Sequence, residues 1–303
     1  MSNVATHVRM RIAITGATGF VGRALVRQAV ERGHTVAALV RPESAVVRPA
    51  HPAVTVTIGT LASPPWEDLV RFSPDACVHT AWITNAGVYL ESAENRRYLD
   101  DSVAFVTGLI ERGMDHVIAL GTAAEYRPSA QPLHEACSPI EPRSAYARAK
   151  HELRLALSEH AHRVGAHLTW ARLFQLYGAG EPAARLCSTV VRRIADGKPV
   201  TLTTPAALRD WIHVDDVAAA LLRLVESRAD TVVNIGTGVG RTVAEIAVTI
   251  AGLLGRPELI APVTVPADGL CPLVSDPTRL RGFGWVPRVE LETGLARLIE
   301  DLR

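Results

Sequence analysis

The glycine-rich stretch Gly16-Ala17-Thr18-Gly19-Phe20-Val21-Gly22 separates two patterned segments near the N-terminus. The apolar run at 12–15 predicts a buried parallel strand. The residues that follow the turn predict an amphipathic helix, because Leu25, Val26, Ala29 and Val30 share one helical face. In such a strand–turn–helix unit the first glycine permits the tight turn, the second lets the backbone approach a pyrophosphate, and the third lets the helix lie close to the sheet.

The N-terminal amides of that helix would face the phosphates of a dinucleotide. The turn therefore predicts a dinucleotide-binding site, and the alternative is a tight strand-to-helix turn that binds no ligand. The cofactor contacts expected from it are Gly16, Thr18, Gly19, Phe20, Val21 and Gly22.

Length and composition narrow the class of protein. A chain of 303 residues is long enough for two domains or lobes, and its net charge of +1 gives no general attraction to nucleic acid or to an anionic membrane. No apolar run approaches the roughly 20 residues that cross a bilayer, and the first ten residues have no hydrophobic signal-peptide centre. The four cysteines, Cys271 among them, show no CxxC spacing. We therefore expect a reduced, cytoplasmic protein without a zinc framework.

Strand and helix patterns alternate up to about residue 173, which is typical of a doubly wound α/β fold. Beyond the apolar run at 12–15, we expect strands at 35–40, 54–58, 75–81, 116–120 (ending at Gly121-Thr122) and 168–173, and long helices at 92–112 and 144–162. From Phe174 onward the elements shorten and glycine and proline become frequent. The predicted architecture is a Rossmann-type parallel sheet in 1–173 and a smaller mixed α/β lobe in 174–303, with crossover segments back to the first domain left open.

The end of the second strand bears on cofactor choice. NAD-preferring sites usually place Asp or Glu there to hold the ribose 2′-hydroxyl, whereas this chain has Val40-Arg41. Because a guanidinium can pair with a 2′-phosphate, we favour NADP, with NAD and a surface role for Arg41 as the alternative.

The fourth strand ends where the ligand crevice should lie, and there we expect Thr80 and Ala81 to contact the cofactor. For His79, holding the loop backbone is favoured over catalysis. Trp82 either forms a wall of the sugar pocket or is simply buried.

Tyr146 and Lys150 are four residues apart and therefore share one face of the predicted helix. A nearby ammonium favours the phenolate of a tyrosine whose ordinary pKa is about 10, and lysine can also bind the nicotinamide ribose. Lys150 is one of only two lysines among 32 basic residues. A lysine kept in so arginine-rich a chain favours a role that arginine cannot fill, such as tuning a neighbouring phenol. With the hydroxyl of Thr122 beside them, these groups suit hydride transfer at a carbonyl or alcohol carbon.

The chain resembles the extended short-chain dehydrogenases/reductases that modify nucleotide sugars, the NAD-dependent epimerase/dehydratase family. The resemblance covers nearly the whole chain and rests on these motifs: GATGFVG, Pro74-Asp75-Ala76-Cys77-Val78-His79, Thr122 with Tyr126, Tyr146-x-x-x-Lys150, Arg172-Leu173-Phe174, RDWIHVDDVA at 209–218, and Asn234-Ile235-Gly236-Thr237-Gly238. It implies Thr122, Tyr146 and Lys150 as catalytic residues, a nucleoside diphosphate sugar as substrate, and a homodimer formed through the helices near 92–112 and 144–162.

The same resemblance implies substrate contacts. Arg209 would clamp the diphosphate, and the alternative is a structural salt bridge to Asp210 or Asp215. Gln175 occupies the place where this branch usually has an asparagine near the substrate phosphates, so the amide is kept and its reach changes. Trp82 and Thr122 complete the expected substrate set.

Three reactions share this scaffold: 4,6-dehydration, 4-epimerisation and 4-keto reduction. The related dehydratases have Asp-Glu directly after the threonine, whereas Ala123-Ala124 follow Thr122 here and Glu125 is one place late. In a strand-like segment one place reverses the direction of a side chain, which disfavours dehydration. The missing acid on the second strand favours an NADPH-dependent 4-ketoreductase over a 4-epimerase that holds NAD. A regulator that binds NADP without turnover is a further alternative.

Overall fold

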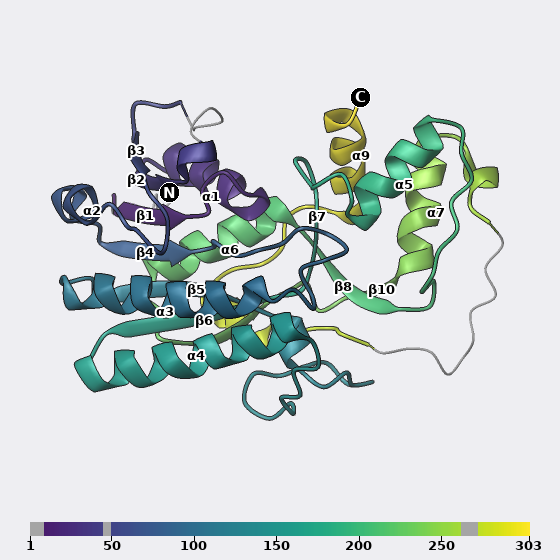
Figure 1. The fold of residues 1–303 in the computed structure, drawn as a ribbon. Coiled ribbons are helices and arrows are strands. Elements are labelled where there is room, and N and C mark those ends of the chain that lie inside the picture. Colours follow the sequence, from purple (N-terminus) through teal and green to yellow (C-terminus); the bar gives the residue numbers. More distant parts are fainter. Residues whose placement is uncertain (1–8, 45–49, 262–271) are drawn as a thin grey trace, which may run out of the picture.

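A computed structural model describes residues 9–44, 50–261 and 272–303, and Cys271 lies outside this part of the chain. Its main feature is a seven-stranded parallel sheet with the strand order β3-β2-β1-β4-β5-β6-β9 (Figure 1). The bounds of its strands are β1 (Arg11–Thr15), β2 (Thr35–Val40), β3 (Val54–Ile58), β4 (Ala76–His79), β5 (His116–Thr122), β6 (His167–Leu173) and β9 (Thr231–Ile235). The order reverses at β1, which is the doubly wound arrangement predicted from the sequence.

Helices cover both faces of this sheet. One face carries α1 (Phe20–Glu31) and α6 (Val214–Glu226), and the other carries α2 (Trp66–Phe72), α3 (Glu94–Glu111) and α4 (Ala145–Val164) (Figure 1). The alternation within β1 explains this, because Ile12 and Ile14 belong to the first apolar core while Ala13 belongs to the second.

The rest of the chain forms a smaller mixed unit. Its three-stranded sheet has the order β10-β8-β7, with strands β7 (Gln175–Tyr177), β8 (Leu208–His213) and β10 (Gly240–Thr242). Around it pack α5 (Leu186–Ala195), α7 (Val243–Leu253) and α9 (Leu291–Asp301), with their own apolar core (Figure 1). The short helix α8 (Thr278–Gly282) contacts β9.

Two elements from beyond residue 173 belong to the large sheet. Strand β9 pairs in parallel with β6, and α6 packs against α1. The division of the chain at residue 173, with or without crossover segments, stays a prediction.

Several predicted boundaries were wrong in detail. The fourth strand ends at His79, so Thr80 and Ala81, which were predicted within it, lie in the loop after it, whereas the fifth strand ends at Thr122 as predicted. Residues 123–125 form a 3-10 turn (η2, Ala123–Glu125) rather than continuing the strand, because the Thr122 hydroxyl accepts the N–H of Ala124 and caps the turn.

Among the described helices, none has the length and apolarity needed to cross a bilayer. Within the same residues, no cluster of three or more His, Cys, Asp or Glu side chains is arranged to hold a metal ion.

Candidate active site

The glycine-rich turn is packed too tightly for side chains at two of its glycines. Gly16 has φ +65°, and a Cβ there would lie 2.6 Å from Thr80 Oγ1. A Cβ on Gly22 would lie 2.0 Å from the carbonyl oxygen of Gly16. Helix α1 begins after Gly19, and neither a side-chain cap nor an acidic residue in the first turn blocks its N-terminus in the described structure. The open amides and close backbone fit the pyrophosphate of a dinucleotide.

Gly22→Ala is expected to raise the Kd for the dinucleotide about tenfold, because the new methyl group would push α1 away from the turn. Titration with NAD and with NADP, followed by calorimetry, measures the effect. Gly252→Ala is the matched control, because a Cβ at that position of α7 meets no described atom within 4 Å. Unchanged affinity in Gly22→Ala would remove this turn from the binding site.

Hydrogen bonds connect the ends of β1 and β4 beside this turn. The hydroxyl of Thr15 accepts the N–H groups of Thr80 and Ala81, both at 3.1 Å, and bonds His79 Nδ1 at 2.9 Å. Ser102 bonds the other nitrogen of this imidazole at 3.0 Å. Burial, together with the charge of Lys150, lowers the pKa of His79 to about 3, so the ring is neutral. His79 thus acts through Thr15 on the loop after β4.

Strand β5 and helix α4 position the three residues predicted as catalytic, Thr122, Tyr146 and Lys150. The Ser144 hydroxyl accepts the N–H of Ala147 at 3.1 Å and caps α4, so Tyr146 lies in its first turn and Lys150 one turn later. Thr122 is the last residue of β5, and its hydroxyl lies near the phenol of Tyr146.

The phenol of Tyr146 differs from the expectation of an acidic tyrosine. Burial and the neighbouring Tyr89, whose ring packs edge-on at 5.0 Å, raise the pKa of Tyr146. The hydrogen bond with Thr122 and the charge of Arg185 oppose this shift without cancelling it. The cause is that the protein removes water from the phenol more completely than its charges compensate.

Lys150 is 2% exposed, and its ammonium donates to the carbonyl oxygen of Leu120 at 2.8 Å. The same nitrogen lies 3.9 Å from the centre of the Trp82 ring. Burial lowers the pKa of Lys150 to about 7, while the charge of Glu125 acts in the opposite direction. Trp82 is buried, and its indole donates to Asn95. The Trp82 ring therefore packs against the Lys150 ammonium, and a contact of Trp82 with a sugar stays a prediction.

From the sequence, Glu125 was interpreted only as an acidic residue one place later than the acid of the related dehydratases. The structure places this fully buried carboxylate directly behind the end of β5, where it accepts the backbone N–H of Thr122 at 3.0 Å. Trp170 and Arg172 of β6 donate to it at 2.9 and 3.0 Å. The S/T-x-x-E spacing of a capping box, here Thr122 to Glu125, was the signal that could have revealed this contact.

The other predicted binding residues lie on elements other than β5 and α4. Arg41 is exposed and pairs with Glu43 at 3.2 Å, directly after β2. Gln175 begins β7, and Arg209 lies in β8, where it donates to the carbonyl oxygen of Leu208 at 2.9 Å. The carboxylate of Asp210 accepts hydrogen bonds from Thr237, Gly238 and Ser275.

Residues 12–236 match the sequence profile described as "NAD dependent epimerase/dehydratase family". The chain belongs to this family. Membership in the NAD dependent epimerase/dehydratase family makes it an oxidoreductase-type enzyme and confirms the resemblance found in the sequence.

Individual relatives cover almost the whole chain. A UDP-glucose 4-epimerase of Corynebacterium glutamicum is 26% identical, covering 96% of this chain and 94% of its own length. A probable UDP-glucuronate 4-epimerase of Rhizobium meliloti is 24% identical, covering 96% of each chain. The crystal structure of UDP-glucose 4-epimerase from Thermus thermophilus, in complex with NAD, matches at 24% identity with a TM-score of 0.82 and covers 97% of this chain and 99% of its own. That last likeness confirms the fold.

For a member of the NAD dependent epimerase/dehydratase family, the geometry joins two requirements of hydride chemistry. The turn at 16–22 offers backbone amides for a dinucleotide, and the end of β5 offers the Thr122–Tyr146 hydroxyl pair. The structure adds to this site the buried carboxylate of Glu125 and its partner Arg172.

Proposed function

We propose that the protein is an NAD-dependent 4-epimerase of a nucleoside diphosphate sugar. The observation that carries this proposal is that α4 brings the Tyr146 phenol and the Lys150 ammonium to the end of β5, beside the Thr122 hydroxyl. The two relatives named above as sugar-nucleotide 4-epimerases, which match over nearly their full lengths, support it. This reverses the ranking made from the sequence, where reduction came before epimerisation.

In this proposal the tyrosine handles the proton at the sugar C4 oxygen. Tyr146, whose phenolate would be favoured by the positive nicotinamide ring when NAD is bound, takes the hydroxyl proton as the C4 ketone forms and returns it to the same oxygen when the alcohol is restored. The hydroxyl of Thr122 donates to that oxygen and stabilises its developing charge. The chemistry that NAD supplies, when bound, is reversible hydride transfer at C4. The nicotinamide ribose of NAD would contact Lys150 and Tyr146, and its pyrophosphate would bind the turn at 16–22. The cofactor would also contact Thr80 and Ala81 in the loop after β4.

The substrate contacts belong to the same proposal. Gln175 and Arg209 would hold the diphosphate, and Trp82 would border the sugar. The lobe from residue 174 onward would close over the nucleotide. We also propose the homodimer through α3 and α4, which pack against each other on one face of the sheet (Figure 1). Light scattering on the purified protein tests the dimer.

A second candidate is NADPH-dependent reduction of a 4-keto-6-deoxy nucleotide sugar. The observation that favours it is Arg41, an exposed guanidinium at the end of β2 where an acidic residue would select NAD. Arg41→Ala should then weaken NADP binding about tenfold and leave NAD binding unchanged.

One assay separates the candidates. The protein is incubated with UDP-glucose and UDP-glucuronate without reductant, and in parallel with NADPH and dTDP-, GDP- and CDP-linked 4-keto-6-deoxy sugars. Nuclear magnetic resonance reads the configuration at C4. Interconversion of C4 isomers in the samples without reductant supports the epimerase, and product formed mole for mole with oxidised NADPH in the parallel samples supports the reductase. A protein that binds the dinucleotide and turns over none of these sugars would contradict both and favour the regulator.

A further inference from the structure

A chain of buried polar side chains runs from the catalytic threonine away from the site. Glu125 bonds Arg172, whose guanidinium donates to the hydroxyl of Tyr126 at 2.8 Å. That hydroxyl donates to Asn234 at 2.9 Å, and the Asn234 amide donates to the carbonyl oxygen of Leu133 at 2.7 Å. These contacts join residues that are 46 to 108 positions apart in the sequence.

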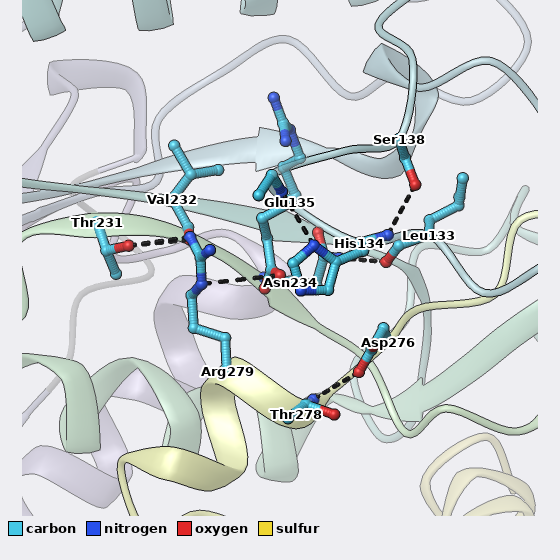
Figure 2. Close-up of polar contacts among 12 residues, drawn as sticks. Leu133, His134, Glu135, Ser138, Thr231, Val232, Asn234, Asp276, Thr278 and Arg279 are labelled. Atoms are coloured by element: carbon cyan, nitrogen blue, oxygen red, sulfur yellow. Dashed lines mark hydrogen bonds and ion pairs between the residues drawn. The ribbon is translucent and has the colours of Figure 1, made fainter.

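The far end of this chain contains a second buried carboxylate (Figure 2). Glu135 accepts the backbone N–H of Asn234 at 2.8 Å, and the guanidinium of Arg279 lies 3.8 Å from its other oxygen. Arg279 also donates to the carbonyl oxygen of Val232 at 2.7 Å. The described part of the protein therefore holds a glutamate–arginine pair at each end of this chain. The pair at Glu125 is buried on both sides and touches the end of β5, whereas Arg279 is partly exposed.

We propose that Glu125 is a positioning residue for the proposed reaction: it holds the backbone of Thr122 and places a fixed negative charge behind the Tyr146–Lys150 pair. The proposal deepens the proposed function and rests on it for the identity of the reacting groups.

The positional part of the role follows from two anchors on one strand end. Lys150 donates to the carbonyl oxygen of Leu120, and Glu125 accepts the N–H of Thr122 two residues later. Gly121, between them, lies against the carboxylate so closely that a Cβ there would be 2.6 Å from Glu125 Oε1 and 2.3 Å from Trp170 Nε1. A shift of this carboxylate would therefore move the backbone that presents the Thr122 hydroxyl.

The charge of Glu125 is stable in this setting. Burial would raise the pKa of Glu125, but the interaction with His151, the charge of Arg172 and the hydrogen bond from Thr122 outweigh it, and the pKa is lowered. The charged or titratable groups that face the carboxylate come from three elements: Arg172 of β6, Tyr126 next to η2, and Tyr146, Lys150, His151 and Arg154 of α4. Glu125 is thus ionised across the working range of pH.

This charge acts on both reacting groups in the same direction. It favours the protonated ammonium of Lys150 and the protonated phenol of Tyr146. Removing it should lower the pKa of each group, so the entire pH–rate profile should move to lower pH by about one unit.

The test compares Glu125→Gln with Glu125→Asp and Glu135→Gln. Glutamine keeps an acceptor for the N–H of Thr122 and removes the charge, whereas aspartate keeps the charge and shortens the reach. We expect the profile of kcat/KM against pH to shift by about one unit in Glu125→Gln alone. Glu125→Asp should lose rate without a shift. Glu135→Gln, which disturbs the pair of Glu135 with Arg279, should lower the thermal stability without a shift.

A second measurement does not need substrate. The tyrosinate ultraviolet absorbance is titrated in the wild type, Glu125→Gln and Glu125→Asp, each paired with a Tyr146→Phe version that isolates the signal of Tyr146. The Tyr146 signal should titrate at lower pH in Glu125→Gln and at the wild-type pH in Glu125→Asp. An unchanged titration in folded Glu125→Gln overturns the proposal. If the titration shifts but no sugar is epimerised, the proposed function fails and the placement of the charge stands.

Discussion

Tyr146→Phe should reduce kcat about a thousandfold while the protein keeps its fold and its affinity for the dinucleotide. The substitution removes only the phenolic oxygen, the atom that exchanges the proton with the sugar C4 oxygen in the proposed reaction. The ring remains and keeps its edge-on contacts with Tyr89 at 5.0 Å and with Trp82 at 6.4 Å. Rapid-quench turnover of UDP-glucose, with calorimetric titration of NAD alongside, measures the two effects separately.

Tyr98→Phe provides the matched control for this loss. Its ring also packs against Trp82, at 5.8 Å, but Tyr98 lies on α3 and its hydroxyl has no part in the proposed reaction. We expect this variant to keep activity within about twofold. If Tyr146→Phe turned over substrate at the rate of Tyr98→Phe, the proton would have to pass through another group.

Lys150→Met should abolish most of the activity and yet stabilise the protein at neutral and acidic pH. The buried ammonium has its pKa lowered to about 7 from an ordinary value of 10.5, so folding disfavours its charged form. Methionine fits an apolar contact with Trp82 and carries no charge to bury. After subtraction of the hydrogen bond to Leu120 and the contact with the Trp82 ring, we expect a gain of about 2–4 kcal/mol below pH 7.

The sign of the pH dependence checks this argument. Between pH 7 and 10.5 the unfolded wild type binds more protons at Lys150 than the folded one, so the stability of the wild type rises with pH in that interval. The advantage of Lys150→Met should shrink over the same interval and stay constant below it. Chemical denaturation of both proteins at pH 6, 8 and 10 measures the difference. A constant difference across this range would mean that Lys150 is not charged at a cost in the folded protein.

Much of the candidate site could be predicted because its signals are local. The four-residue spacing of Tyr146 and Lys150 places both on one face of α4 wherever that helix lies, and Ser144 before them fixes where it begins. Contacts across the fold left no such signal. Glu125 and Arg172 are 47 positions apart, and nothing in the sequence near either residue indicates that the two will pair.

The prediction of an acidic phenol was wrong because spacing along a helix says nothing about water. The sequence places an ammonium near Tyr146, but burial by Tyr89 and the loop around it is decided in three dimensions, and burial dominates the pKa. The direction of Glu125 was likewise misjudged, because a capped 3-10 turn replaces the expected strand after Thr122.

By itself, the amino-acid sequence determined strands β1 to β6 of the large sheet, the glycine turn and the helix that carries Tyr146 and Lys150. Apolar periodicity and the glycine pattern of a tight turn extend over only a few residues, so they can be recognised in a single sequence. Only the tertiary structure decided that β9 joins the sheet beside β6, that Lys150 rests on Trp82 and bonds Leu120, and that Glu125 supports Thr122. Those outcomes depend on which buried groups meet after the whole chain has packed, and on how much water is excluded where they meet.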